Sequence, residues 1–287
     1  MTFKTLSAAL LGASLLALTA CSGGTEATTE APKKEAVKAP ATWAEILAHP
    51  RRAENVARDK FRNPAKTLEF FEVTPGKKVG EIWPGWYTSV IAPYLAENGG
   101  TYVGVLYQGD SERVTTRNAA FIDKYVGAEG FGTVEIGKFG QEDEPILETG
   151  DLDVLLSFRN VHNWMGRDYA DKAFADFYAA LKPGGILGIV EHRLPESATQ
   201  NPKGSTGYVQ ESYMKDLAKR AGFEFVAASE VNANPRDTAD HPFGVWTLPP
   251  RSFVPEDKAR IPEGFDAELF KNIGESDRAT LKFRKPL

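Results

Sequence analysis

Short apolar runs that suit buried strands alternate with helical patterns along most of this chain. The clearest strand-like run is 153–158 (DVLLSF), and the clearest helical spacing of apolar residues covers 169–181. A continuous apolar run is typical of a parallel strand that is covered on both faces. Repeated strand-helix units predict an α/β fold with a doubly wound, mostly parallel sheet and with ligands at the carboxyl ends of its strands. We expect strands at 78–83, 101–107, 133–139, 153–158, 186–191 and 223–231, and helices between them at 88–96, 111–125, 169–181 and 210–221.

Three further segments complete the expected domain. Helical patterns at 43–60 and 64–71 precede the first strand, and Pro64 suits a first helical turn. The alternating residues 278–285 (RATLKFRK) predict an edge strand and bring the sheet to seven strands. Residues 232–277 are rich in Pro, Asp and aromatic residues and show little periodicity, so we expect a long insertion that folds over the ligand site as a lid.

The first 20 residues have the pattern of a secretory signal. Lys4 is followed by an apolar stretch from Leu6 to Leu18 and then by small residues. A membrane-spanning helix needs about 20 predominantly apolar residues. The pattern therefore favours a cleaved signal peptide over a retained anchor helix.

The residues that end this signal, Leu18-Thr19-Ala20-Cys21, resemble a bacterial lipobox. The resemblance implies that Cys21 carries a lipid and anchors an exported, periplasmic protein to a membrane. Ser22, which follows, implies the outer membrane. Because Cys21 is the only cysteine, the pattern excludes disulfides, zinc thiolates and cysteine nucleophiles from the rest of the chain. We expect 21–41 to form a lipidated flexible tether and 42–287 the folded domain.

Charge and motif content exclude several classes of function. Lys and Arg number 34 against 39 Asp and Glu, and no block of like charge stands out, which argues against nucleic acid as a partner. No dinucleotide glycine fingerprint, phosphate-binding loop or Gly-x-Ser-x-Gly elbow is present, so a nicotinamide-linked oxidoreductase is disfavoured. The four His residues are well separated and show no HExxH spacing, so the sequence lends no support to a metal site.

A series of short motifs, from about residue 50 to the C-terminus, carries a family resemblance. The motifs are RNPAKTL (62–68), GEIWPGWYT (80–88), IAPYL (91–95), FRNVHNW (158–164), LKPGGILGIVEHR (181–193), GYV (207–209), NANPRD (232–237) and IGESDRATLKFRKP (273–286). In this order they resemble class I S-adenosylmethionine-dependent (SAM-dependent) methyltransferases, and more narrowly a bacterial group of predicted methyltransferase lipoproteins. The resemblance implies a Rossmann-like methyltransferase fold, SAM as cofactor and a small-molecule acceptor.

The resemblance also implies which residues contact the cofactor. The family's first strand ends in an acidic residue followed by glycines at every second position, and here these positions hold Glu81, Trp83, Gly85 and Tyr87. Glycine allows close approach of the backbone to a ligand. The family's ribose-binding acid is replaced by a leucine. The implied cofactor-binding residues are Glu81, Gly85, Tyr87, Asp110 as the nearest carboxylate to that leucine, Gln141 at the adenine-reading position, and Asn160.

The residues after the fourth strand are the candidates for catalysis. Methyl transfer from a sulfonium is an in-line displacement, so positioning matters most. His162 has a suitable pKa for a base, Asn163 lies beside it, and Trp164 is placed to face the sulfonium or an acceptor ring. A hydrogen-bonded structural histidine and a core tryptophan are the alternatives. Secondary candidates are Glu191 and His192 after the fifth strand, Glu142, and Asn232, Asn234, Arg236, Asp237 and His241 in the insertion, where turn chemistry is the alternative to lid contact.

Two functions remain open at this point. The first is an envelope-anchored SAM-dependent methyltransferase that acts on a small acceptor. The second is a non-catalytic protein of the same fold that binds another small ligand or a protein partner. The second gains support because SAM is made in the cytoplasm, so an exported enzyme needs a supply of it.

Overall fold

The computed structural model describes residues 39–147 and 150–287. The predicted signal peptide, the lipidation at Cys21 and most of the tether lie outside the described residues. Within the described ranges, no helix is both long enough and apolar enough to cross a bilayer.

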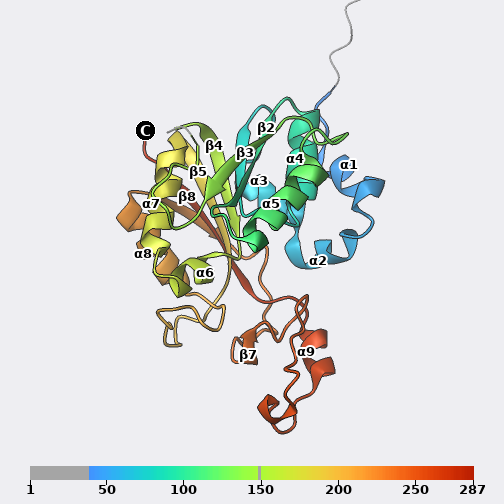
Figure 1. The fold of residues 1–287 in the computed structure, drawn as a ribbon, viewed down its shortest axis with the longest axis vertical. Coiled ribbons are helices and arrows are strands. Elements are labelled where there is room, and N and C mark those ends of the chain that lie inside the picture. The colour runs from blue at the N-terminus through green and yellow to red at the C-terminus, as the bar shows by residue number, and fades with distance from the viewer. Residues whose placement is uncertain (1–38, 148–149) are drawn as a thin grey trace, which may run out of the picture. The chain divides into compact units, whose positions relative to one another are not determined.

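A seven-stranded sheet organises the domain (Figure 1). The strand order is β3-β2-β1-β4-β5-β8-β6. β8 runs antiparallel to both of its neighbours, and the other strands are parallel to one another. The predicted doubly wound, mostly parallel seven-stranded sheet is therefore confirmed. The strands are β1 (Lys78–Ile82), β2 (Thr101–Tyr107), β3 (Val134–Phe139), β4 (Leu152–Phe158), β5 (Leu181–His192), β6 (Glu224–Ser229) and β8 (Arg278–Arg284).

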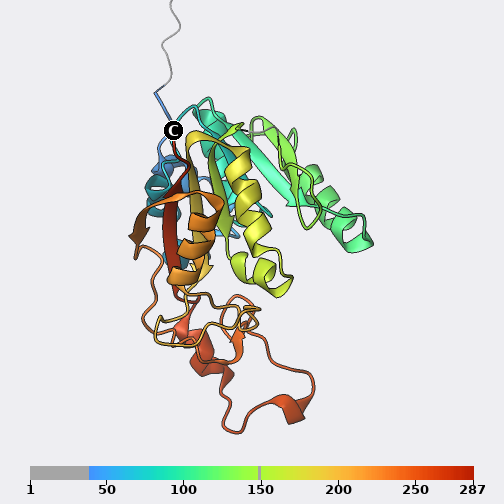
Figure 2. The same cartoon turned by 90° about the vertical axis from the view of Figure 1, so that its left-hand side faces the viewer.

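Helices cover both faces of this sheet (Figures 1 and 2). One apolar core joins a sheet face to α6, α7 and α8, and the other joins the opposite face to α1, α3, α4 and α5. Burial of both faces accounts for the continuous apolar strands. The helices are α1 (Trp43–Ala48), α2 (Asp59–Arg62), α3 (Pro64–Phe70), α4 (Thr88–Glu97), α5 (Glu112–Tyr125), α6 (Val161–Gly166), α7 (Ala170–Ala180), α8 (Glu211–Ala221) and α9 (Ala267–Ile273), with short 3-10 turns η1 (Pro50–Arg52), η2 (Val56–Arg58) and η3 (Lys258–Arg260).

Two predicted elements differ from the structure. The single helix expected at 43–60 is divided into α1, η1, η2 and α2, because His49 before Pro50 is extended, with φ −65° and ψ 133°. The expected edge strand β8 is interior, between β5 and β6. Its alternating polar residues include Lys282, whose ammonium donates to Glu72 at 2.9 Å. The polar alternation of β8 thus reflects ion pairing on one face of the sheet and does not mark an exposed edge.

The insertion between β6 and β8 lies beyond the carboxyl ends of the parallel strands (Figures 1 and 2). It contains the short strand β7 (Pro242–Val245), η3 and α9. Its anchor is the buried Asp237, which accepts from Tyr208 Oη at 3.0 Å, from His241 Nε2 at 2.8 Å and from the Asp277 amide at 2.8 Å. Side-chain hydrogen bonds of this kind can hold in place those parts of a long loop that have no regular secondary structure.

Other candidates in the insertion have structural partners as well. Asn232 Nδ2 donates to Thr67 Oγ1 and Thr280 Oγ1, both at 3.0 Å, and Asn234 Nδ2 donates to the Glu275 carbonyl at 2.7 Å. Arg236 Nη1 donates to the carbonyl of Asn272 at 2.8 Å. Asn232 thus fixes the insertion to α3 and β8, whereas the other two bonds join parts of the insertion to each other.

Candidate active site at the carboxyl edge of the sheet

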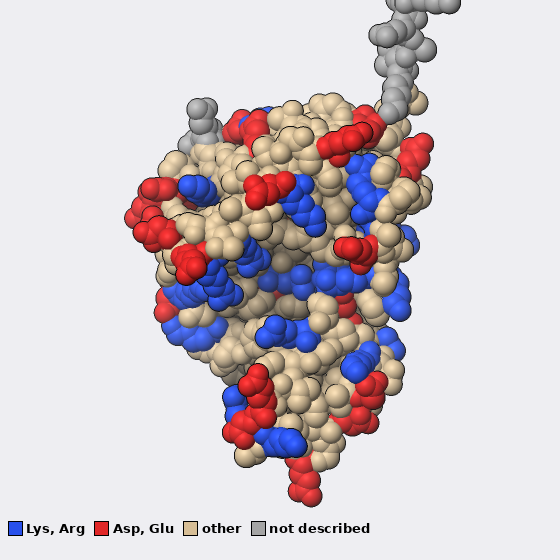
Figure 3. Space-filling model, turned by 45° about the vertical axis from the view of Figure 1, so that its right-hand side comes forward, with Lys and Arg blue, Asp and Glu red and all other residues tan. Residues whose placement is uncertain are grey.

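A cavity of about 310 Å³ opens where β1, β4 and β5 end. Its walls come from the β1–α4 loop, the start of α6, the end of β5, and residues 245–251 of the insertion, which cover it. Figure 3 shows a hollow in this face with basic side chains gathered around it. The volume is at the lower end of the range for small-molecule sites.

The β1–α4 loop is organised by a buried carboxylate. Glu81 accepts from Tyr102 Oη at 2.7 Å and Thr88 Oγ1 at 2.9 Å through one oxygen, and from the Gly85 amide at 3.2 Å through the other. Burial raises the pKa of Glu81. No atom of the described part of the chain lies within 4 Å of the position that a Cβ would take on Gly85, so the loop leaves open space at the cavity wall.

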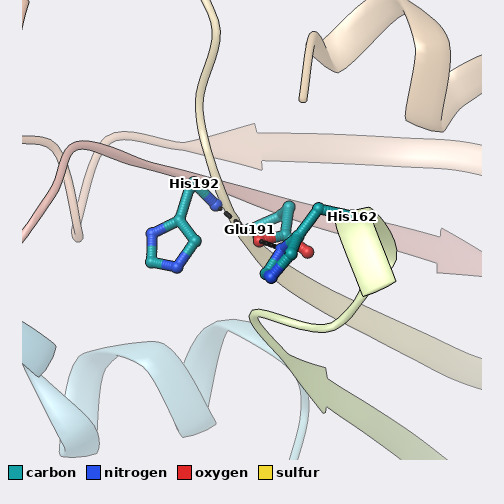
Figure 4. Close-up of side chains that lie close together, drawn as sticks. All are labelled: His162, Glu191 and His192. Atoms are coloured by element: carbon teal, nitrogen blue, oxygen red, sulfur yellow. Dashed lines mark hydrogen bonds and ion pairs between the residues drawn. The ribbon is translucent and has the colours of Figure 1, made fainter. Parts of the chain in front are cut away.

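A histidine-carboxylate pair lies at the same edge of the sheet (Figure 4), and its histidine, His162, borders the cavity. Glu191 is fully buried at the end of β5 and accepts from the Val161 amide at 2.5 Å and from the His192 amide at 2.9 Å. Its Oε1 lies 3.1 Å from His162 Nδ1. Two amide donors require Glu191 to be an acceptor, so Nδ1 of His162 carries the proton and Nε2 is left as the basic nitrogen.

His162, Glu191 and His192 also meet the composition of a metal site, with their ligand atoms within 4.8 Å of one another. The adjacency of β4 and β5 brings them together, which the spacing of histidines along the sequence did not indicate. The fit to a cation is poor, however. Both Glu191 oxygens accept amide hydrogens, and His192 Nδ1 is 2.5 Å from Ser276 Oγ. Burial, His162 and nearby arginines lower the pKa of His192 well below its usual value, and a metal ion would meet the same repulsion.

Five arginines of the described residues line the cavity; Arg117 and Arg251 are exposed, and the other three come from three different elements. Arg62 ends α2, Arg159 follows β4, and Arg278 begins β8. Glu275 accepts from Arg62 Nε at 3.2 Å, from Arg58 Nε at 2.6 Å and from Arg278. Burial opposes ionisation of Glu275, yet Arg278, Arg62 and Arg58 lower its pKa to about 2. Burial, reinforced by Arg159, lowers the pKa of Arg62 to about 9.

No protein-family model matches this chain, and no curated protein matches it either. Solved structures do show similarity. A SAM-dependent methyltransferase from Aquifex aeolicus is 18% identical, with 66% of this chain and 93% of that chain covered and a TM-score of 0.47. A TehB-like SAM-dependent methyltransferase from Corynebacterium glutamicum is 19% identical, with 83% and 100% covered and a TM-score of 0.43. The cyclase SpnF is 19% identical, with 79% and 80% covered and a TM-score of 0.49.

The strand order, with an antiparallel β8 inserted between β5 and β6, establishes the architecture. This is the Rossmann-like methyltransferase fold. In doubly wound folds ligands bind at the carboxyl ends of the strands, which is where this cavity lies. The residues predicted to hold SAM can therefore be compared with their positions.

Four of the six predicted cofactor-binding residues lie at the cavity. Glu81, Gly85, Tyr87 and Asn160 all border the cavity. Tyr87 stacks on the Phe158 ring at 3.8 Å between centroids, and Asn160 Nδ2 lies 3.4 Å from the Ile82 carbonyl. These residues form one wall of the cavity.

Trp83 packs against the ends of β2 and β3. The indole is 8% exposed, stacks on Tyr107 at 4.4 Å, and donates from Nε1 to the Phe139 carbonyl at 3.2 Å. It thus extends from the end of β1 to the ends of β2 and β3. Asp110 is exposed and does not border the cavity, and Gln141 lies in a separate hollow of about 130 Å³ behind Trp83.

The three predicted catalytic residues separate into two groups. His162 and Asn163 border the cavity. Trp164 is fully buried in the core, edge-on to Phe177 at 5.1 Å, so the core alternative describes it. Glu142 is exposed, and its amide donates to Gln108 Oε1 at 3.0 Å.

Sequence reasoning missed the arginines of the cavity. Arg62, Arg159 and Arg278 each lie inside a motif of the resemblance, yet they are far apart along the chain. Only the pairing of β4 with β5 and of β5 with β8 brings them to one cavity. An arginine directly after a buried strand was the one local signal available.

Proposed function

We propose that the chain is a SAM-dependent methyltransferase that acts on a small acceptor in the cell envelope. The observation that carries the proposal is the His162–Glu191 pair, whose histidine borders the cavity near Gly85 at the carboxyl edge of the sheet. Bound SAM would supply an electrophilic methyl group. Glu81, Gly85 and Asn160 would hold its methionine end.

The side chains around the cavity supply a base for the acceptor. Nε2 of His162 takes the proton that the acceptor loses, and Glu191 stabilises the imidazolium that results. Trp246 and Leu248 of the insertion supply apolar surface at this end of the cavity. Methyl transfer then depends mainly on how the acceptor is positioned.

Isothermal titration of the full chain with SAM and S-adenosylhomocysteine tests this proposal. Gly85→Val should abolish binding, because the new side chain enters the open space beside the loop. His162→Ala should keep binding and reduce transfer. Thermal unfolding of each variant controls for folding. If titration of the wild-type chain with millimolar ligand gives no heat, a SAM-dependent methyltransferase activity is excluded.

The position of Trp83 favours a second function, a methyltransferase-fold protein that binds another small ligand, or a protein partner, without using SAM. In that case the indole permanently occupies the adenosine position. The same titration separates the two functions, because this second protein gives no heat with either cofactor form.

The anchoring part of the proposal rests on Leu18-Thr19-Ala20-Cys21. Labelling cells with radioactive palmitate should mark the wild-type chain and leave Cys21→Ser unlabelled. Equal labelling of both would refute lipidation at this cysteine. Separation of inner and outer membranes then tests the assignment to the outer membrane.

A further inference from the structure

We infer that the cavity binds an oxyanion group, a carboxylate or a phosphate, of its small ligand, and that Arg159 is the residue that contacts it. This assignment deepens the proposed function by giving the acceptor a chemical class. It rests on that function only where the ligand is called an acceptor, because the anion can bind whether or not methyl transfer takes place.

Arg159 lies at the cavity without a partner for its guanidinium among the described residues and with an unusual backbone conformation. Its guanidinium borders the cavity, and within 39–147 and 150–287 it has neither a hydrogen-bond acceptor nor an ion-pair partner. Its backbone has φ 63°, a region that non-glycine residues seldom adopt, and its amide donates to the Val190 carbonyl at 2.7 Å. Such backbone strain persists where the surrounding structure imposes it, often at ligand sites.

The surroundings of Arg159 carry an excess of positive charge. Arg58, Arg62 and Arg278 share the single carboxylate of Glu275. Arg62 is 1% exposed, and its Nη2 is buried without a partner among the described residues. Buried cations are normally paired, because desolvation without compensation is expensive. One carboxylate for four guanidiniums leaves a site that lacks negative charge.

The remaining charged groups at the cavity do not restore the balance. Among the described residues, Glu81 is the one carboxylate on the wall, and its two oxygens already accept three hydrogen bonds. Glu191 lies behind His162 and is held by amides. Burial and the neighbouring Arg278 lower the pKa of Arg159 to about 10, which agrees with an uncompensated cation.

The sign of this charge selects among ligands. A guanidinium binds carboxylates and phosphates through paired N–H donors. A donor with a cationic sulfonium adds positive charge to the cavity, so an anionic acceptor beside Arg159 would offset it. The half-buried position of Arg159 would strengthen that contact relative to one in bulk water.

Titration calorimetry with two probes, inorganic phosphate and succinate, tests the inference on the full chain in detergent at low chloride. Arg159→Gln should weaken binding of the preferred probe at least about tenfold, which corresponds to about 1.4 kcal/mol. Arg159→Lys, which keeps the charge, should retain part of the affinity. Comparison of the probes assigns the group as phosphate or carboxylate.

Arg117→Gln is the matched control. Arg117 also borders the cavity, but it is exposed and lies over the Tyr107 ring at 4.3 Å. Its loss should leave probe affinity unchanged. Equal weakening in Arg117→Gln and Arg159→Gln would overturn the inference, because a diffuse field and not a built site would then bind the anion. Wild-type affinity in Arg159→Gln, or no binding of either probe, would overturn it as well.

A further arm separates the acceptor from the cofactor's own carboxylate. S-adenosylhomocysteine carries that carboxylate and 5′-methylthioadenosine does not. If Arg159→Gln weakens the binding of S-adenosylhomocysteine but not that of phosphate or succinate, the arginine binds the cofactor and the inference is wrong. If neither nucleoside binds while the probes still depend on Arg159, the anion site stands and methyl transfer fails.

Discussion

Replacement of Trp83 tests both the local backbone and the assignment of the cofactor position. Removal of a buried aromatic side chain costs about 3–5 kcal/mol of the free energy of unfolding. Trp83 has φ 49°, however, and a non-glycine residue in this left-handed region costs about 1–2 kcal/mol. Glycine removes this strain and alanine does not. We therefore expect Trp83→Gly to be more stable than Trp83→Ala by about 1 kcal/mol, although both lie below the wild type.

Urea unfolding followed by far-UV circular dichroism measures this difference. Trp246, on the covering side of the cavity, is the matched control because its φ is not positive. There alanine should be the more stable replacement. The reasoning about the backbone fails if Trp83→Ala equals or exceeds Trp83→Gly in stability.

The same variants report on the ligand. If the indole occupies the adenosine position, Trp83→Gly should bind S-adenosylhomocysteine at least about tenfold more tightly than the wild type. Trp246→Gly should not change that affinity. Unchanged affinity in Trp83→Gly would refute the placement of the indole in the cofactor's position.

Three further predictions follow from the same geometry. Glu275 has a folded pKa of about 2 against an ordinary 4.5, so its carboxylate stabilises the fold above pH 4.5, and this stabilisation is lost as the pH falls toward 2. Glu275→Gln should therefore lower the free energy of unfolding by about 3 kcal/mol at pH 7 and by far less near pH 2. A difference between variant and wild type that does not change with pH in urea titrations would contradict this. Trp164→Phe should destabilise less than Trp83→Ala and leave ligand affinity intact, because its buried indole N–H has no partner among the described residues; calorimetry that shows lost binding would place it at the site after all. Zinc or EDTA should leave the thermal midpoint unchanged, and a zinc-induced rise that disappears in His162→Ala would establish a metal site.

The sheet was predictable because strands that are buried on both faces need apolar residues at successive positions, which the sequence shows as continuous apolar runs. β2 matches its predicted range, and α8 ends at Gly222, whose φ of 101° suits a left-handed cap. The break after α1 was less predictable, because apolar spacing continued past Pro50. The place of β8 depends on pairing across the sheet, which local periodicity does not encode.

The site was predictable only in part. His162, Asn163 and Gly85 follow directly from the rule that ligands gather at carboxyl ends of strands. The Glu191 contact and the three arginines required knowledge of which strands are neighbours. The indole of Trp83 lies across the ends of β2 and β3. The sequence showed only that a tryptophan stands where the family has a glycine, and it did not show the direction of the side chain.

The anchoring of the insertion by Asp237 bears on how fast a ligand exchanges. Because the covering segment is tied at a buried carboxylate to Tyr208, His241 and the start of β8, we expect ligands to enter through the existing opening and not after a slow opening of the cover. Association should then depend on electrostatic attraction by the basic rim and slow with rising ionic strength, whereas a gated site would show a rate that salt hardly alters.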